Sequence, residues 1–227
     1  MNHVATAIYL LEAIAFISSI IYYKRNRGKP FFYFMLFLGS VVFFENIGKY
    51  NRYPELFSFI NNTPFQKNFW LFNIQLLISM VFYAIFFSLF INNQRSKRII
   101  YSLVILFFSI ASIVLFFDDN FFKGFSPFTL IAGSILVLIS ISIYYFELLK
   151  SEQLLSIWKS MVFYISVGAF VYHLCTTPLF LYSIFLKSQA NPAFIETYKI
   201  VVYVSNLFLY LVYIFGFFTT QNQSLND

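Results

Sequence analysis

Hydrophobic and polar positions are segregated along the chain in long blocks. Runs of about 20 mostly apolar residues, the length that a helix needs to cross a bilayer, are separated by short stretches rich in charged residues, Asn, Gly and Pro. The pattern predicts an all-α membrane protein, a single bundle over 1–227. Seven runs are predicted as transmembrane helices: 4–23, 31–50, 69–91, 99–117, 128–149, 161–186 and 194–218.

The composition supports this interpretation. Hydrophobic residues make up 60% of the chain and charged residues 11%, and the mean hydropathy is +0.75. Soluble domains are nearer half apolar and a quarter charged, so a water-soluble globule is excluded. No stretch is polar enough to form an extramembrane domain of useful size. We therefore expect the activity to reside in the helices and their short connectors.

Basic residues are distributed unequally between the two sets of connectors. Five Lys and Arg follow the second, fourth and sixth helices, whereas nine follow the first, third and fifth. The positive-inside rule then predicts an external N-terminus and a cytoplasmic C-terminus. The net charge of +6 reports this orientation, and we expect no nucleic-acid partner. The nine are Lys24, Arg25, Arg27, Lys29, Arg95, Lys97, Arg98, Lys150 and Lys159.

Two helices contain related hexapeptides. SSIIYY at 18–23 and SISIYY at 140–145 are identical at four of six positions. With seven spans, the first three helices and the last three run in the same directions. One hypothesis is therefore a parallel repeat of three plus one plus three helices, joined by the fourth.

Polar residues inside the spans predict a binding pocket. Ionisable groups are costly in lipid and normally face the protein interior, and those in this chain fall at similar estimated depths in the outer half of the bundle. On the last helix several polar residues recur at helical spacing, which places them on one face. The inner half is mainly Phe, Ile and Leu, so we predict a polar pocket that opens outward over an apolar floor. The candidate ligand-binding residues are Glu12, Glu45, Asn73, His173, Thr177, Lys199, Tyr203 and Asn206.

Each candidate also has a purely structural interpretation. Glu45 can pair with Lys49 one helical turn on, and Lys199 can extend to the headgroups at the membrane surface. His173 can be a hydrogen-bonded packing residue. The pocket hypothesis depends on the common depth of these residues and not on any one of them.

The residues needed for metal, haem or phosphate chemistry are missing from the sequence. Two histidines and one cysteine provide no metal-ligand cluster, and there is no Gly-rich phosphate loop. Candidate nucleophiles such as Ser134 and Ser166 have no base at a recognisable spacing. We therefore predict no catalytic residue, no metal and no cofactor.

Several segments carry a resemblance to a known group of proteins. They are FLGS at 37–40 followed by Glu45, WLFN at 70–73, AGSILVLISISIYYFELLKSE at 132–152, FYISVG at 163–168 and an N…LY…GFF pattern from Asn206 to Phe218. Over nearly its whole length the chain resembles small, uncharacterised bacterial seven-helix membrane proteins that are often encoded beside sensor histidine kinases. The resemblance implies a signalling association and no particular catalytic or binding residue.

Three functional interpretations follow. The first is a non-enzymatic, receptor-like or sensor-associated signalling component that meets a membrane sensor kinase or another membrane protein in the bilayer. The alternative is a small-solute transporter built on the three-plus-one-plus-three repeat, and the third is an intramembrane enzyme. A sensor predicts a closed cytoplasmic half, whereas a transporter predicts polar residues through both halves. A homo-oligomer is left open.

The predicted topology can be tested with reporter fusions at residues 26, 62, 95, 122, 155 and 190 and at the C-terminus. Because each connector lies on the side opposite its neighbours, the reporters should alternate, starting in the cytoplasm at 26 and ending there at the C-terminus. Activity of paired periplasmic and cytoplasmic reporters measures the side. A periplasmic C-terminus would contradict the prediction.

Overall fold

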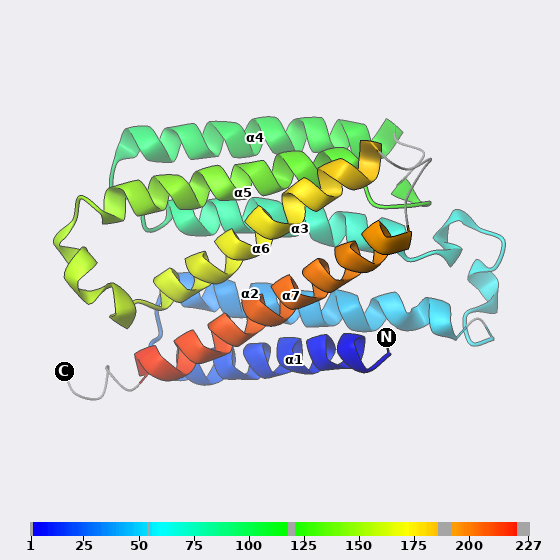
Figure 1. Ribbon diagram of the computed structural model, residues 1–227, viewed down its shortest axis with the longest axis horizontal. Coiled ribbons are helices and arrows are strands. Elements are labelled where there is room, and N and C mark those ends of the chain that lie inside the picture. The colour runs from blue at the N-terminus through cyan, green and yellow to red at the C-terminus, as the bar shows by residue number, and fades with distance from the viewer. Residues whose placement is uncertain (1, 54, 118–120, 186–191, 222–227) are drawn as a thin grey trace.

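The computed structural model describes residues 2–53, 55–117, 121–185 and 192–221. Within these ranges the regular elements are all helical, and seven helices are long and apolar enough to cross a membrane (Figure 1). The prediction of an all-helical multi-pass membrane protein is confirmed at this level. The long helices are α1 (Asn2–Arg25), α2 (Lys29–Ile47), α3 (Phe69–Ser88), α4 (Gln94–Phe117), α5 (Pro127–Leu148), α6 (Met161–Phe185) and α7 (Pro192–Gln221).

Short 3₁₀ helices occupy two of the connectors. They are η1 (Gly48–Arg52), η2 (Ser58–Ile60) and η3 (Pro64–Gln66) between α2 and α3, and η5 (Glu152–Lys159) between α5 and α6. Connectors therefore gather at two ends of the bundle. We call the end that carries η1 to η3 the 48–66 end, and the opposite end, which carries the nine basic residues of the sequence analysis, the basic end.

The helix bounds agree with the predicted spans except at the start of α4. This helix begins at Gln94, five residues before the predicted span at 99. The Asn93 side-chain oxygen accepts a hydrogen bond from the backbone N–H of Arg95 (2.9 Å), and the Asn93 carbonyl accepts one from Lys97 (3.0 Å). These bonds cap the first turn, so the polar segment 94–98 is helical although it is not apolar. An apolar run marks the part of a helix that suits lipid, not its whole length.

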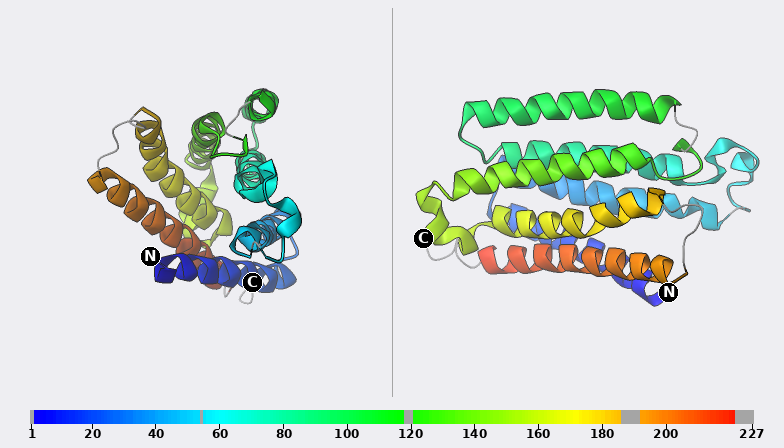
Figure 2. Two further views of the ribbon diagram at one scale, coloured as in Figure 1. Left: turned by 90° about the vertical axis from the view of Figure 1, so that its right-hand side faces the viewer. Right: turned by 45° about the horizontal axis from the view of Figure 1, so that its top comes forward.

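Six helices form a closed ring, and the seventh packs outside it. Around the ring each helix contacts the next in the order α1, α2, α3, α5, α6, α7, and α7 returns to α1. Helix α4 contacts α3 and α5, and the end-on view shows it as the outermost helix (Figure 2). Its outward face is apolar and exposed, with Ile105, Leu106 and Phe108 among its exposed side chains. Such a face suits a lipid environment.

Aromatic side chains fill the ring toward the basic end. The Phe34 ring lies 5.3 Å from those of Phe86 and Tyr213, which joins α2, α3 and α7. Phe37 stacks on Phe82 with ring centroids 4.2 Å apart. Phe34 and Tyr213 are at most 1% exposed. This aromatic cluster closes the interior of the bundle on that side.

Two glycines allow the helices to approach closely. A Cβ atom added at Gly133 of α5 would lie 2.5 Å from Met80 Cγ on α3, and one added at Gly216 of α7 would lie 2.6 Å from Tyr164 Cβ on α6. Both distances are shorter than van der Waals contact. Because Tyr164 Cβ is attached directly to the α6 backbone, it cannot rotate away, and any side chain at 216 would push the two helices apart.

We expect Gly216→Ala to destabilise the protein by about 1–3 kcal/mol, since overpacking at a helix contact outweighs the gain in helix propensity. The apparent Tm of the purified protein in detergent measures the change. Gly124→Ala is the matched control, because a Cβ there meets nothing within 4 Å. Equal Tm values for the two variants would refute the close approach of α6 and α7.

Candidate functional site

A cavity of about 400 Å³ lies inside the ring, between α2, α3, α5, α6 and α7. Its lining extends from the 48–66 end to just past the middle of these helices, where Tyr83, Tyr172 and Tyr210 lie. The polar ones are Glu45, Gln75, Ser79, Tyr83, Ser134, Tyr172, His173, Tyr198, Asn206 and Tyr210. The apolar ones are Phe37, Leu38, Val41, Phe72, Leu76, Met80, Phe125, Leu130, Ala169, Phe180, Val202 and Leu209.

The cavity is open at one side and closed at the other. Phe125 is 48% exposed, and Glu45 and Tyr198 are partly exposed, so the lining reaches solvent or lipid at the 48–66 end. Toward the basic end the lining ends at Phe37 and Tyr83, which belong to or adjoin the aromatic cluster. The Tyr83 and Tyr213 hydroxyl groups are hydrogen-bonded at 2.8 Å and join α3 to α7 there. The cavity is therefore blind.

A buried serine–histidine pair forms one wall of the cavity. His173 on α6 is 3% exposed, and its Nδ1 lies 3.0 Å from the hydroxyl oxygen of Ser134 on α5. The backbone carbonyl of His173 accepts a hydrogen bond from the Thr177 hydroxyl. Pro178, the next residue, has no N–H and interrupts the hydrogen bonding of α6. These two bonds fix the histidine from both its side chain and its backbone.

Gln75 presents an unmatched acceptor to the cavity. The Ser79 hydroxyl donates its single proton to the Gln75 backbone carbonyl (2.8 Å), so it can only accept from the Gln75 side-chain NH₂, which lies 3.4 Å away. This contact directs the amide nitrogen of Gln75 to Ser79, so the amide oxygen points away from Ser79. Gln75 is 9% exposed, and its Oε1 accepts no hydrogen bond within the part of the chain that the structure describes. A buried oxygen of this kind calls for a donor.

A second carboxyl group stands directly behind the cavity wall. Glu12 on α1 is 5% exposed, and its carboxyl group lies within hydrogen-bonding reach of the Tyr210 hydroxyl, which lines the cavity. Glu45 and Lys49 are close enough to interact with Glu12 electrostatically. The Lys49 ammonium donates to the Asn46 side-chain oxygen (3.0 Å) and lies 4.3 Å from the centre of the Tyr9 ring.

The structure brings together some of the eight candidate residues. Glu45, His173 and Asn206 line the cavity, and Asn206 contacts the Tyr172 hydroxyl there. Glu12 reaches the cavity wall through Tyr210, and Thr177 acts on the backbone of His173 as described above.

Lys199 and Tyr203 are half-buried on α7 and are not among the lining residues. Tyr198 and Val202, the residues just before them, occupy the cavity positions instead. One residue turns a helix by about 100°. The face of α7 that lines the cavity is therefore rotated by about one residue from the polar stripe predicted from the sequence.

Asn73 forms hydrogen bonds with the connector between α4 and α5. Its side-chain NH₂ donates to the carbonyls of Phe121 (3.1 Å) and Gly124 (2.9 Å), and its oxygen accepts from the Ser126 backbone N–H (2.9 Å). Asn73 is fully buried and is not among the lining residues. Asn73 is expected from the sequence to face the pocket, but its side chain instead holds the start of α5, whose first turn Ser126 caps.

Sequence reasoning left out Gln75, Ser79, Ser134 and Tyr172 as pocket residues, although each is polar and lies within a span. The first three had that signal available. Tyr172 did not, because 17 tyrosines occur in the chain and their composition does not say which of them turn inward. Among the described residues no group of three or more His, Cys, Asp or Glu side chains is placed to hold a metal ion.

A second hollow, about 580 Å³ in volume, lies between the end of α2 and the connector that follows it. Aromatic residues, including Tyr50, Phe57 and Trp70, dominate its lining, and Lys49 is the one charged residue among the lining residues that the structure describes. It lacks the converging polar groups of the ring cavity. We therefore take the smaller cavity as the candidate site.

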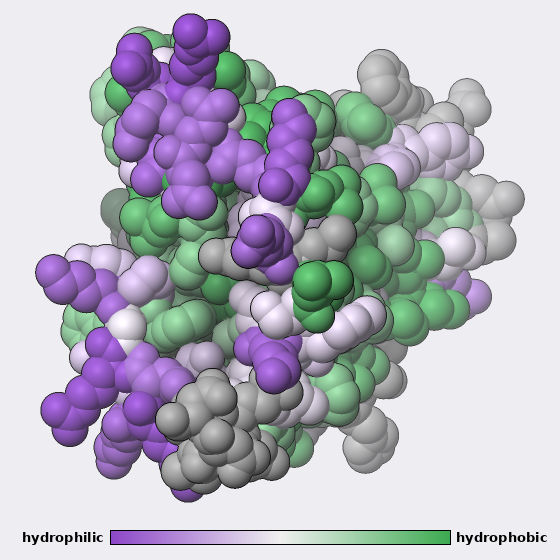
Figure 3. All heavy atoms as spheres, turned by 90° about the vertical axis from the view of Figure 1, so that its left-hand side faces the viewer, coloured by the Kyte–Doolittle hydropathy of each residue, from purple (hydrophilic) through white to green (hydrophobic). Residues whose placement is uncertain are grey.

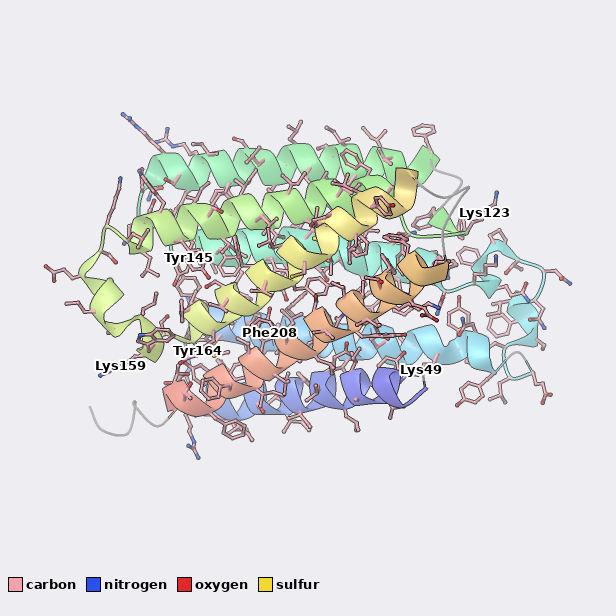
Figure 4. The ribbon with its side chains drawn as sticks, viewed as in Figure 1. Lys49, Lys123, Tyr145, Lys159, Tyr164 and Phe208 are labelled. Carbon is pink, nitrogen blue, oxygen red and sulfur yellow. The ribbon has the colours of Figure 1, made fainter. Side chains whose placement is uncertain are left out.

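The two ends of the bundle differ in charge. Lys24, Arg25, Arg27, Lys29 and Arg95 are exposed at the basic end, and hydrophilic side chains gather on that face (Figure 3). Lysine occurs at both ends, Lys159 at the basic end and Lys49 and Lys123 at the 48–66 end (Figure 4), so the ends differ in the number of basic residues.

We expect Asn73→Ala to destabilise the protein by roughly 2–4 kcal/mol, because it leaves one buried and two part-buried backbone groups without their partner. Thermal unfolding in detergent measures the loss. Asn61→Ala, at an exposed position in the α2–α3 connector, is the control and should leave the Tm unchanged. An unchanged Tm for Asn73→Ala would show that the connector does not depend on this side chain.

Comparison with known proteins adds no further assignment to this geometry. No protein-family model matches the chain, and no match was found among curated proteins or among solved structures. The evidence for function is therefore the arrangement of the residues: seven helices suited to a membrane, and a blind, partly polar cavity inside a ring of six of them.

Proposed function

We propose that the protein is a receptor-like signalling component of a bacterial cytoplasmic membrane and that it binds a small ligand in the ring cavity without chemical conversion. The observation that carries the proposal is the blind cavity. Its polar lining extends from the 48–66 end to just past the middle of the bundle, where the Tyr83–Tyr213 bond and the aromatic cluster around Phe34 close it. A closed half is expected of a sensor rather than of a pathway through the membrane.

In this proposal the cavity opens to the outside of the cell. The positive-inside rule places the basic end in the cytoplasm, and the cavity opens at the other end. The N-terminus is then external and the C-terminus cytoplasmic. The exposed basic side chains of the α1–α2 connector, such as Arg25 and Arg27, support this orientation.

Helix α7 supplies the route by which a ligand would act at the cytoplasmic end. Asn206 and Tyr210 line the cavity, and Tyr213, one turn further, is part of the aromatic cluster. A ligand changes the packing only by binding one arrangement of the helices more tightly than another. Because the cytoplasmic connectors are short, the change would be read by a partner in the membrane, such as a sensor kinase or another membrane protein.

A small-solute transporter is the second candidate, and the order of the ring favours it. If α1, α2 and α3 are matched with α5, α6 and α7, every neighbouring pair in the ring maps onto another neighbouring pair, and α4 stands outside. This symmetry supports the three-plus-one-plus-three repeat, as does the similar burial of Tyr22 and Tyr144 (6% and 5%) at matched positions. Repeats of this kind underlie alternating access.

An intramembrane enzyme is the third candidate. The Ser134–His173 hydrogen bond is the observation on which a nucleophilic mechanism would depend.

Labelling of a cavity cysteine from each side of the membrane separates receptor from transporter. The one native cysteine, Cys175, is exposed on α6 and is first replaced by Ala. Val202→Cys then places a thiol in the cavity wall. With a membrane-impermeant maleimide we expect labelling in cells whose periplasm the reagent can enter, and none in inverted vesicles, because the aromatic cluster closes the cytoplasmic half.

Lys67→Cys and Arg95→Cys, both at exposed connector positions, are the controls for the two sides. Lys67→Cys should react only in cells and Arg95→Cys only in inverted vesicles. Labelling of Val202→Cys from the cytoplasmic side as well would overturn the receptor proposal in favour of alternating access. Absence of Val202→Cys labelling both in cells and in inverted vesicles would contradict an outward-open cavity.

A further inference from the structure

We infer that the cavity ligand is a small organic cation, a protonated amine attached to an apolar body. This inference rests on the proposed function, since it names the chemical class of ligand for the same cavity. Three independent features of the lining lead to it: an unmatched acceptor, a carboxyl group in a lining that includes no Lys or Arg among the residues described, and a high density of aromatic rings.

The unmatched acceptor requires a ligand that donates. Gln75 is nine-tenths buried, and its Oε1 accepts no hydrogen bond from any described residue. Ser79 fixes the amide so that the nitrogen faces the serine. A protonated amine carries up to three N–H donors and no acceptor, so it satisfies this oxygen without leaving a polar group of its own unpaired. A carboxylate ligand would place a second acceptor beside Oε1.

The charges around the cavity select the sign of the ligand. Glu45 lines the cavity, and no Lys or Arg does so among the residues described. Glu12 on α1 and Lys199 on α7 both lie outside the lining, so the groups behind it are of both kinds and do not decide the sign. Lys49 on α2 is also outside the lining: its ammonium donates to Asn46 and lies against the Tyr9 ring. In a site of low dielectric constant, the Glu45 carboxylate of the lining favours a cation.

Aromatic rings provide the remaining walls. Tyr172, Tyr198, Tyr210 and Phe180 come from α6 and α7, and Phe37 and Phe72 face them from α2 and α3. The faces of aromatic rings attract organic cations, and cages of such rings bind ammonium groups. The volume of about 400 Å³ falls within the range of small-molecule sites. The apolar part of the lining then accommodates the body of the ligand.

Three probes of equal shape test the inference on the full-length protein in detergent: 2-phenylethylamine, 2-phenylethanol and phenylacetate. At pH 7 they differ mainly in the charge of the head group. Titration calorimetry should give a dissociation constant for the amine at least tenfold lower than for the alcohol, and the acid should bind weakest. Tighter binding of the alcohol or the acid, or no binding of the amine, would overturn the inference.

Matched variants assign the binding to the cavity. Glu45→Gln and Gln75→Leu should each weaken amine binding about tenfold, the scale of one charged or buried hydrogen bond. Glu55→Gln and Gln66→Leu make the same substitutions at exposed positions outside the cavity and should leave binding unchanged. Equal loss in the variants and their controls would show that the probe does not bind in this cavity.

A thiol reaction measures the selectivity for charge even where a lining variant fails to fold. In the Cys175→Ala background, Val202→Cys should react with a cationic methanethiosulfonate at least tenfold faster than with an anionic one, relative to Ser58→Cys at an exposed site. An equal or inverted ratio would overturn the inference. The reagents reach purified protein from both of its ends, so this result does not depend on which side of the membrane the cavity faces. Failure of the labelling test in membranes would instead overturn the receptor proposal.

Discussion

Hydrocarbon offers no hydrogen-bond partner, so each polar group within the seven spans must find one inside the protein. Many Ser and Thr hydroxyl groups of the helices bond a carbonyl in their own preceding turn, as Ser40 does with Phe37 and Ser140 with Leu136. Other polar groups are bonded between helices, and these bonds position the site. The Ser134–His173 pair joins α5 to α6, and the hydroxyl bond between Tyr83 and Tyr213 joins α3 to α7.

The cavity exists because the ring is held at its two ends by different interactions. At the basic end, bulky aromatic side chains from α2, α3 and α7 fill the space between the helices. Toward the 48–66 end, polar and aromatic side chains line an open space instead of filling it, and Asn73 holds the α4–α5 connector against α3. Helix α4 lies outside the ring and leaves the interior to the other six. Helix α7 extends through both parts of the bundle, since Tyr210 lines the cavity and Tyr213 belongs to the aromatic cluster.

The seven helices could be predicted from sequence because lipid imposes one strong rule, a run of about 20 apolar residues per span. The side of each helix that turns inward was less predictable. On α5, Gly133, Val137, Ser140 and Tyr144 recur at helical spacing and are buried, whereas Glu147, the next position on the same face, is half-buried. On α1, Tyr22 is buried and its neighbour Tyr23 is half-buried, and in a chain so rich in aromatic residues both faces look alike. Contacts between helices, such as that of Ser134 with His173 39 residues later, have no signal in a single sequence.

Discrimination among ligands in such a cavity depends on what replaces water. A cavity of this size can hold water molecules that donate to Gln75, so a ligand must offer at least an equivalent donor. An alcohol meets that requirement as well as an amine does. The preference for a cation must therefore arise from Glu45 and from the ring faces, whose attraction for positive charge water does not share. Rejection of an anion needs only Gln75 and Glu45, because both present oxygen to it. The two selectivities have separate physical origins, and removing the carboxylate at 45 should reduce the first to what the ring faces provide, while Gln75 still maintains part of the second.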